Sequence, residues 1–197
     1  MKEWFRHGRC GALALMALVL AASSAQSSPW SIRYSPGMPS QMVAAEDGSY
    51  YFDFPAADGV HYVTKTPLSE PRQSITMRFA IIGNGRFVAT QGDQSARVRL
   101  FMQRRNDNMT AREEHKRFWS VAYVELVTGE FTLSSPLDEN EWFSVFGRKG
   151  SEARGEFRTT LSNLGSVGFT FGGMFAGHGV YLTGGNARFV LKEFDIR

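Results

Sequence analysis

Cysteine is almost absent from this chain, because Cys10 is the single cysteine among its 197 residues. A lone cysteine cannot form an intramolecular disulfide, and this one lies ahead of an apolar segment near the N-terminus. The rest of the chain therefore has no cysteine nucleophile and no thiolate ligand for a metal ion. Its stability must come from a packed core, and its length is sufficient for one domain of ordinary size.

Long apolar runs are also lacking. The longest extends from Gly11 to Ala22, which is 12 residues, whereas a helix needs about 20 apolar residues to cross a bilayer. A basic segment precedes this run and small residues follow it, which is the three-part pattern of a secretory signal peptide. We predict a signal peptide over residues 1–25 and a protein that is secreted or periplasmic, with no stable membrane span after cleavage. An uncleaved N-terminal anchor is the alternative.

The chain has no strong excess of one charge. Cleavage would remove three basic residues and one acidic residue, which lowers the net charge from +3 to about +1. The most basic segment, residues 104–117, contains RR and HKR but is interrupted by Asp107, Glu113 and Glu114. An interrupted basic segment in an exported protein does not favour binding of nucleic acid, so we expect no nucleic-acid partner.

A convincing helical period is missing from every run of about ten residues. Alternation of apolar and polar residues is common instead: Met77, Phe79 and Ile81 alternate within 74–82, and Val98, Leu100 and Met102 within 97–103. A period of two is typical of half-buried strands. Residues 106–116 are polar and predict either a long loop or one helical turn. The expected strands are 31–34, 49–54, 60–64, 74–82, 86–90, 97–103, 118–126, 130–133, 141–146, 157–161, 167–171, 179–183 and 187–196.

The count and spacing of these strands predict an all-β fold, an antiparallel β-sandwich of jelly-roll type. Residues 26–72 are expected to add N-terminal strands and an irregular leader to the same domain, whose sandwich core is 73–197. The strands 49–54 and 60–64 are expected to pair as a hairpin. The glycines of GGMFAGHG (172–179) and TGG (183–185) are interpreted as hairpin turns between the last three strands.

From about residue 74 onward, four segments follow one another in a distinctive order: ARVRLFMQ (96–103), NEWFSVFG (140–147), FRTTLSNLGSVGFTF (157–171) and ARFVLKEFDI (187–196). This order of strands and turns resembles the galactose-binding-like β-jelly-roll domains that many carbohydrate-binding modules share. The resemblance implies binding of a sugar or polysaccharide and no catalysis.

Sugar binding requires an aromatic face for the apolar side of a pyranose ring and polar groups for its hydroxyls. Tyr123 and three further aromatic residues lie in the sandwich half, and polar groups lie on or beyond strand 97–103, where Arg99 and Phe101 are expected to face outward with Gln103. The alternatives are that the tryptophans belong to the core and that Arg99 is an ordinary solvated side chain. The candidate ligand-binding residues are Arg99, Arg104, Asn106, Trp119, Trp142, His178 and Tyr181.

Signatures of catalysis and of metal binding are lacking. His178 lies between glycines, but the histidines show no HxH, HxxxH or HExxH spacing, and a structural role in a turn is the alternative for it. The acidic run DENE (138–141) lacks the glycine of a calcium loop, and GxSxG is absent. We assign no catalytic residue, no metal site and no cofactor.

These observations leave three hypotheses. The first is an exported, non-catalytic binding domain for a carbohydrate or another envelope ligand. The second is a structural or assembly protein of the cell envelope that binds a protein partner. The third, which the missing catalytic signature disfavours, is a polysaccharide-degrading enzyme on the same fold.

Overall fold

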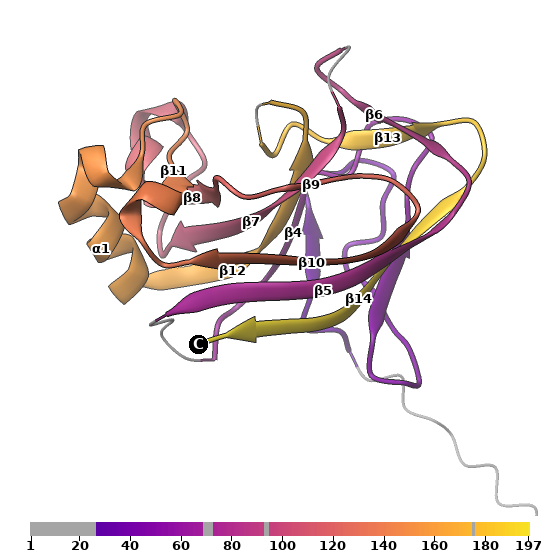
Figure 1. Ribbon diagram of the computed structural model, residues 1–197, viewed down its shortest axis with the longest axis horizontal. Helices are drawn as coiled ribbons and strands as arrows, with labels where there is room; N and C mark the ends of the chain where they lie inside the picture. The colour runs from indigo at the N-terminus through magenta and orange to yellow at the C-terminus, as the bar shows by residue number, and fades with distance from the viewer. Residues whose placement is uncertain (1–26, 69–72, 93–94, 175) are drawn as a thin grey trace, which may run out of the picture.

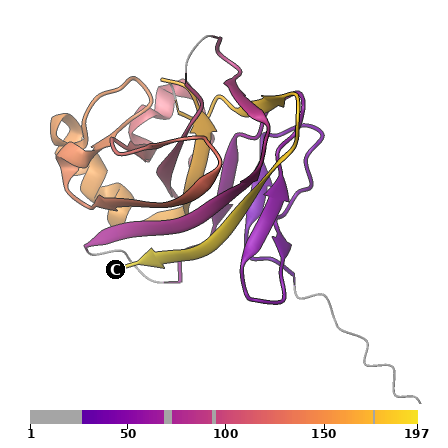
Figure 2. The same ribbon diagram turned by 45° about the vertical axis from the view of Figure 1, so that its right-hand side comes forward.

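The computed structural model describes residues 27–68, 73–92, 95–174 and 176–197, so the predicted signal peptide lies outside the described residues. Two antiparallel sheets pack face to face, and the five-stranded sheet lies in front of the seven-stranded sheet in Figure 1. Figure 2 shows the same layers after a turn about the vertical axis. The predicted fold class is therefore confirmed as an antiparallel β-sandwich of jelly-roll type.

Each sheet combines strands from distant parts of the sequence. The seven-stranded sheet has the order β1 (Ser31–Arg33), β4 (Tyr62–Lys65), β12 (Leu164–Gly172), β7 (Arg97–Arg104), β8 (Arg117–Ser120) and β11 (Trp142–Phe143), and β9 (Val124–Glu125) pairs with the start of β7. The five-stranded sheet has the order β10 (Gly129–Pro136), β5 (Ser74–Gly83), β14 (Ala187–Ile196), β3 (Tyr50–Asp53) and β2 (Val43–Ala44). A two-stranded sheet joins β13 (Val180–Thr183) to β6 (Arg86–Ala89).

The core lies between the two large sheets and is rich in phenylalanine. Phe189 of β14 is fully buried and stacks on Phe79 at 4.9 Å and on Phe169 at 5.0 Å between ring centroids. Because Phe79 and Phe169 come from different sheets, this contact joins the two layers. Offset stacking of aromatic rings adds about 0.5–1.5 kcal/mol per pair to the burial of their area.

One expected strand is a helix. Residues 157–161 belong to α1 (Arg154–Ser162), which follows the short 3₁₀ helix η3 (Gly150–Ala153). Its buried side chains are Phe157 and Thr160, three residues apart, which is the spacing of one helical face. Phe157 packs edge-on against Phe118 at 5.1 Å. The β-branched threonines favoured a strand locally, and packing against the end of the sheet determined a helix instead.

The expected hairpins are also wrong. β3 pairs with β2 and β14, whereas β4 pairs with β1 and β12, so the two segments belong to different sheets. Likewise β12, β13 and β14 do not pair with one another, although glycine-rich segments connect them. The sequence pattern located most of the strands, but it could not show which strands pair.

The polar segment after β7 contains the 3₁₀ segment η1 (Ala111–Lys116), which is kinked at Glu113 and lies where a loop or one helical turn is expected. The expected strand 118–126 is interrupted at residues 121–123 and appears as β8 and β9. The strand expected at 141–146 is reduced to β11, which follows the 3₁₀ helix η2 (Glu139–Glu141). Together with η1, these two changes shape the outer face of the seven-stranded sheet.

Candidate functional site

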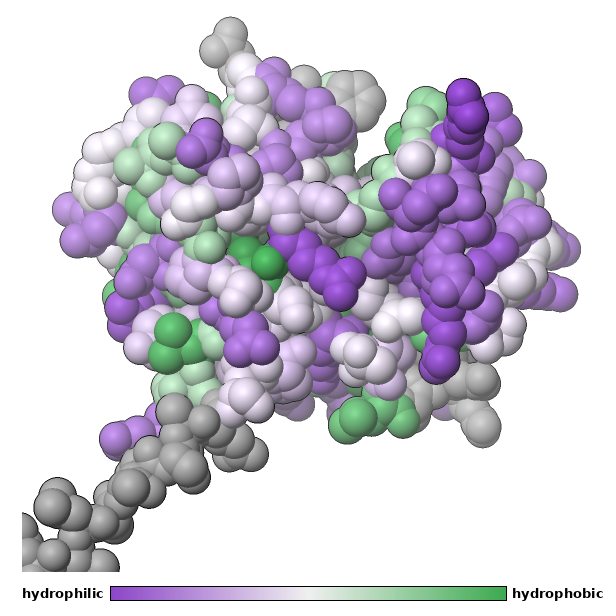
Figure 3. All heavy atoms as spheres, turned by 180° about the vertical axis from the view of Figure 1, so that it is seen from behind, coloured by the Kyte–Doolittle hydropathy of each residue, from purple (hydrophilic) through white to green (hydrophobic). Residues whose placement is uncertain are grey.

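A cavity of about 440 Å³ lies on the outer face of the seven-stranded sheet. Seen from behind, the surface on this side of the molecule is hollowed next to a strongly hydrophilic lobe on the side of α1 (Figure 3). The residues that line the cavity come from β4, η1, β8, β11 and three loops: Tyr62, Met109, Ala111, Arg117, Trp119, Phe143, Val145, Phe146, Gly147, Met174, Ala176 and His178.

Strand register builds the aromatic floor of this cavity. Trp119 of β8 lies directly opposite Phe101 of β7 on one side and Phe143 of β11 on the other. The Trp119 ring lies 5.5 Å from the ring of Phe101 and stacks on Phe143 at 6.1 Å. Tyr62 of β4 packs edge-on against Phe101 at 5.1 Å, a contact that crosses β12. Side chains of four strands therefore form one continuous row of rings.

A buried ion pair holds the loop that forms one wall. Arg117 donates from Nη1 to both carboxylate oxygens of Asp107, at 2.7 and 2.9 Å, and only 4% and 0% of the two side chains are exposed. Asp107 also accepts from Gln103 Nε2 at 2.9 Å and from the backbone N–H of Met109 at 3.0 Å. The pair thus fixes Met109 at the cavity and leaves no net charge there.

The glycine-rich segment between β12 and β13 forms another wall instead of a hairpin turn. Gly177 and Gly179 both have positive φ, and a Cβ atom would lie 2.2 Å from the Tyr62 hydroxyl oxygen at Gly177 and 2.6 Å from His61 Nε2 at Gly179. His61 donates from Nδ1 to the carbonyl of Gly177 at 3.0 Å. Only glycine permits this close approach, which places His178 at the cavity.

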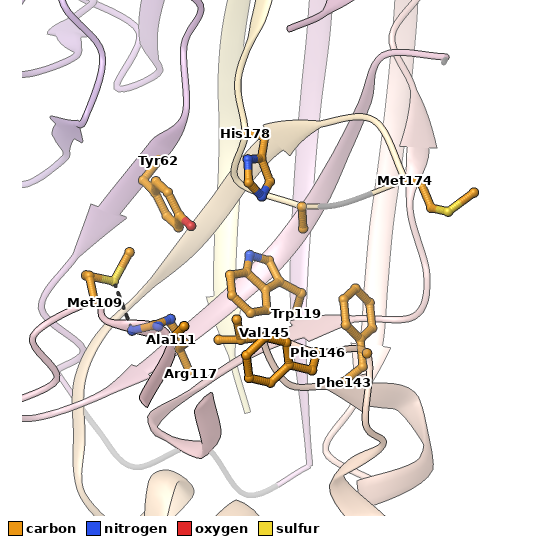
Figure 4. Close-up of a pocket in the computed structure, with 12 residues that line it drawn as sticks. Tyr62, Met109, Ala111, Arg117, Trp119, Phe143, Val145, Phe146, Met174 and His178 are labelled. Carbon is orange, nitrogen blue, oxygen red and sulfur yellow. Dashed lines mark hydrogen bonds between the residues drawn. The ribbon is translucent and has the colours of Figure 1, made fainter. Parts of the chain in front are cut away.

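Two polar side chains of the cavity, Tyr62 and His178, are neutral near pH 7. Burial raises the pKa of Tyr62 to about 12, so its phenol keeps its proton. Burial lowers the pKa of His178, and the nearby His61 lowers it further, so its imidazole is uncharged. Figure 4 shows the His178 ring pointing toward Trp119 across the cavity. The buried indole N–H of Trp119 has no hydrogen-bond partner among the described residues.

The shift of His178 predicts a pH dependence of stability. Its pKa is lowered from 6.5, so below that pH the unfolded chain binds a proton that the folded chain does not, and acidification favours unfolding. We expect the melting temperature of the native protein to fall when the pH is lowered from about 7.5 to about 5.5. The fall should be smaller in His178→Gln, because glutamine does not titrate in this range. Thermal unfolding at both pH values measures the difference. An equal fall in both proteins would contradict the assignment.

The structure places only two of the sequence-predicted site residues at this cavity, Trp119 and His178. Trp142 is fully buried in the core, where its indole N–H donates to the carbonyl of Pro136 at 2.8 Å. Tyr181 lies on β13 beside a separate hollow formed with β6. Neither of these two residues is among those that line the cavity.

The polar candidates have structural partners. Arg99 was expected on an exposed stripe, but only 7% of it is exposed, and it donates to the carbonyls of Ser120 and Val121 at 2.9 and 2.5 Å. Burial is the main cause and the charge of Arg97 a smaller one that together lower the pKa of Arg99 to about 10. Arg104 pairs with Glu156 of α1 at 2.5 Å. Asn106 is exposed in a left-handed turn with φ of 60°, where its carbonyl accepts from Lys116.

Several cavity residues were missed by sequence reasoning, notably Tyr62, Arg117 and Phe143. Arg117 ends the basic segment 104–117 and Asp107 interrupts it, but the charges of the segment alone do not predict that the two form a buried pair. Arg117 and Trp119 are two residues apart on β8, so their side chains lie on the same face of the strand. This spacing is the sequence signal that places Arg117 beside Trp119 at the cavity. Tyr62 and Phe143 join the site through strand pairing, which local sequence does not encode.

Within the described ranges, no cluster of three or more histidine, cysteine, aspartate or glutamate residues is arranged to hold a metal ion. In the same ranges, no helix combines the length and apolar character needed to span a membrane.

Comparison with known proteins yields one structural likeness. No family model matches the chain, and no curated protein matches it. Among solved structures, the chain is similar to one described as "xylan-binding module CBM15", with 15% sequence identity and a TM-score of 0.44, over 86% of this chain and 93% of that chain. A likeness of this degree identifies neither a family nor a ligand, so the ligand must follow from the chemistry of the cavity.

Proposed function

We propose that this protein is an exported, non-catalytic module that binds a neutral carbohydrate in the cavity on the outer face of the seven-stranded sheet. The observation that carries the proposal is the Trp119 indole, which forms an aromatic floor and has a buried N–H without an acceptor in the described part of the chain. Buried donors are normally satisfied, so an unmatched one at a cavity suggests that a ligand supplies the acceptor.

The mixture of groups at the cavity matches the two-sided chemistry of a sugar ring. The C–H face of a pyranose is apolar and packs on aromatic rings, here those of Trp119, Phe143 and Tyr62. The hydroxyls around its edge both donate and accept. The Tyr62 hydroxyl and the neutral His178 imidazole can do the same, and the Trp119 N–H adds a donor.

The electrostatics favour a neutral sugar over an acidic one. Arg117 is the one cationic side chain among the described lining residues, and Asp107 neutralises it at 2.7 Å. An anionic ligand would have to compete with this buried carboxylate for the guanidinium. A neutral ligand leaves the pair intact. It therefore avoids the large free-energy cost of leaving one buried charge without its partner.

The absence of carboxylates supports a non-catalytic role. None of the described residues that line the cavity is aspartate or glutamate, whereas glycoside hydrolysis normally uses two carboxylates on opposite sides of the scissile bond. Export rests on the predicted signal peptide and remains part of the proposal.

Calorimetric titration with neutral monosaccharides and their disaccharides tests the function. We expect saturable binding by the native protein and a loss of affinity of at least about 30-fold in Trp119→Ala, because anchor residues of this type contribute about 2 kcal/mol or more. Trp119→Phe keeps a ring in the row but removes the N–H, so a loss of about 5–15-fold is expected from the missing hydrogen bond. Arg104→Ala, on the neighbouring strand but outside the cavity, is the matched control and should bind as the native protein does.

Failure of the native protein to bind any neutral glycan would overturn the proposal. Equal affinity of the native protein and Trp119→Phe for the sugar would show that the indole N–H does not bind the ligand. A second candidate, an envelope assembly protein, draws support from two apolar side chains at the cavity, Phe146 and Met174, which are 63% and 59% exposed. A stable cross-linked protein complex without glycan affinity would favour that candidate.

A further inference from the structure

An exposed aromatic ring lies beside the cavity without lining it. Tyr123 belongs to the interruption between β8 and β9 and is 42% exposed. Its ring lies over two guanidinium groups, with centroid distances of 4.2 Å to Arg97 Cζ and 4.6 Å to Arg99 Cζ. Both arginines contact the ring, and the exposed part of Tyr123 remains open to solvent.

The support under this ring is rigid. Arg99 is buried and is tied by Nη1 to the carbonyls of Ser120 and Val121, which belong to the chain segment that leads to Tyr123. Arg97 pairs with Glu125 of β9 at 3.7 Å. A ring held by cation–π contacts on a fixed base presents a flat surface at small entropic cost, which is what a stacking platform requires.

The platform is continuous with the cavity. Arg99 Cζ also lies 5.3 Å from the ring centroid of Phe143, which lines the cavity and stacks on Trp119. One guanidinium therefore joins the cavity ring Phe143 to the external ring Tyr123, and all of these groups belong to the same outer face of the sheet. A chain that leaves the cavity along this row meets Tyr123 next.

We propose that the binding site extends from the cavity to Tyr123, so that the protein binds an oligosaccharide with one neutral unit in the cavity and a following unit stacked on the Tyr123 ring. This inference rests on the proposed function. Its consequence is a preference for chains over single sugars, since only a chain can occupy both places at once.

Titration with neutral oligosaccharides of increasing length tests the extension, using the series whose monosaccharide binds the native protein. We expect affinity to rise with length in the native protein. Tyr123→Ala should lose about 5–30-fold for the longer chains, the loss of one aromatic anchor, and keep the monosaccharide affinity within about 2-fold. Tyr123→Phe retains the ring and should restore the preference for chains.

Tyr51→Ala is the matched control, because Tyr51 lies over Arg188 at the same 4.2 Å on the opposite sheet, and it should not change binding. Unchanged affinity of Tyr123→Ala for long chains, with Trp119→Ala still defective, would overturn the extension and leave the proposed function intact. No binding by the native protein would overturn both.

Discussion

Replacing Asp107 with asparagine is expected to lower the free energy of unfolding by about 3–5 kcal/mol, because it removes one partner of a buried ion pair. The Arg117 guanidinium would stay buried without a countercharge, since neither side chain of the pair has more than 4% of its surface exposed. The two hydrogen bonds that Gln103 and Met109 donate to the carboxylate would also weaken. Chemical denaturation of the purified protein measures the loss.

Asp53→Asn provides the matched control for this result. Asp53 also pairs with an arginine at 2.7 Å, but its side chain is 65% exposed and that of Arg188 is 44% exposed. Water screens such a pair, so its removal should cost about 0–1 kcal/mol. If the two substitutions cost the same, the Asp107–Arg117 pair is not the anchor that we describe. Because Asp107 holds the cavity wall at Met109, Asp107→Asn should weaken sugar binding as well.

Replacing Gly168 with alanine is expected to destabilise the protein by about 3 kcal/mol or more, at the upper end of the range for overpacking. A Cβ atom at this position would lie 2.0 Å from the carbonyl oxygen of Val63 and 2.8 Å from Cα of Thr64. Both are backbone atoms, so no change of rotamer relieves the collision. β12 and β4 would have to separate at the centre of the sheet, which also moves Tyr62 away from the cavity.

Gly155→Ala is the control for Gly168→Ala and should have the opposite sign. A Cβ atom at Gly155 meets nothing within 4 Å, and the residue lies in α1. Alanine in a helix is favoured over glycine, so stability should rise by about 0.5–1 kcal/mol. A comparable loss of stability in both variants, measured by thermal or chemical unfolding, would contradict the steric explanation.

The sequence predicted most strands because alternation is a local property. Met77, Phe79 and Ile81 all face the core of the five-stranded sheet as their period of two requires. The same reasoning failed at α1, where Phe157 and Thr160 satisfy a helical spacing only once Phe118 is placed beside them. It also assigned Arg99 to the surface, because the sequence shows two alternating faces but does not show that Tyr123 and Phe143 cover the outer one.

The candidate site follows a similar division. Trp119 and His178 were selected by residue type, since large aromatic and imidazole groups are the ones that ligands use most readily. Tyr62, Arg117 and Phe143 were not selected, because each reaches the cavity through a pairing partner distant in sequence. In the sequence, Trp142 and Trp119 are equivalent candidates, and only the tertiary structure places Trp142 in the core and Trp119 at the cavity. The indole N–H of Trp142 donates to the carbonyl of Pro136, whereas that of Trp119 meets no acceptor in the described residues.

By itself, the sequence determined an all-β chain without disulfides, with one apolar N-terminal segment and with aromatic residues enough for a core and a binding face. These properties depend on composition and on periods of two, which need no knowledge of distant contacts. Strand order, the burial of the Asp107–Arg117 pair and the use of the glycines of 172–179 as a cavity wall were decided by tertiary structure alone. Each depends on contacts between residues far apart in the chain, and such contacts produce no periodic pattern of residues in a single sequence.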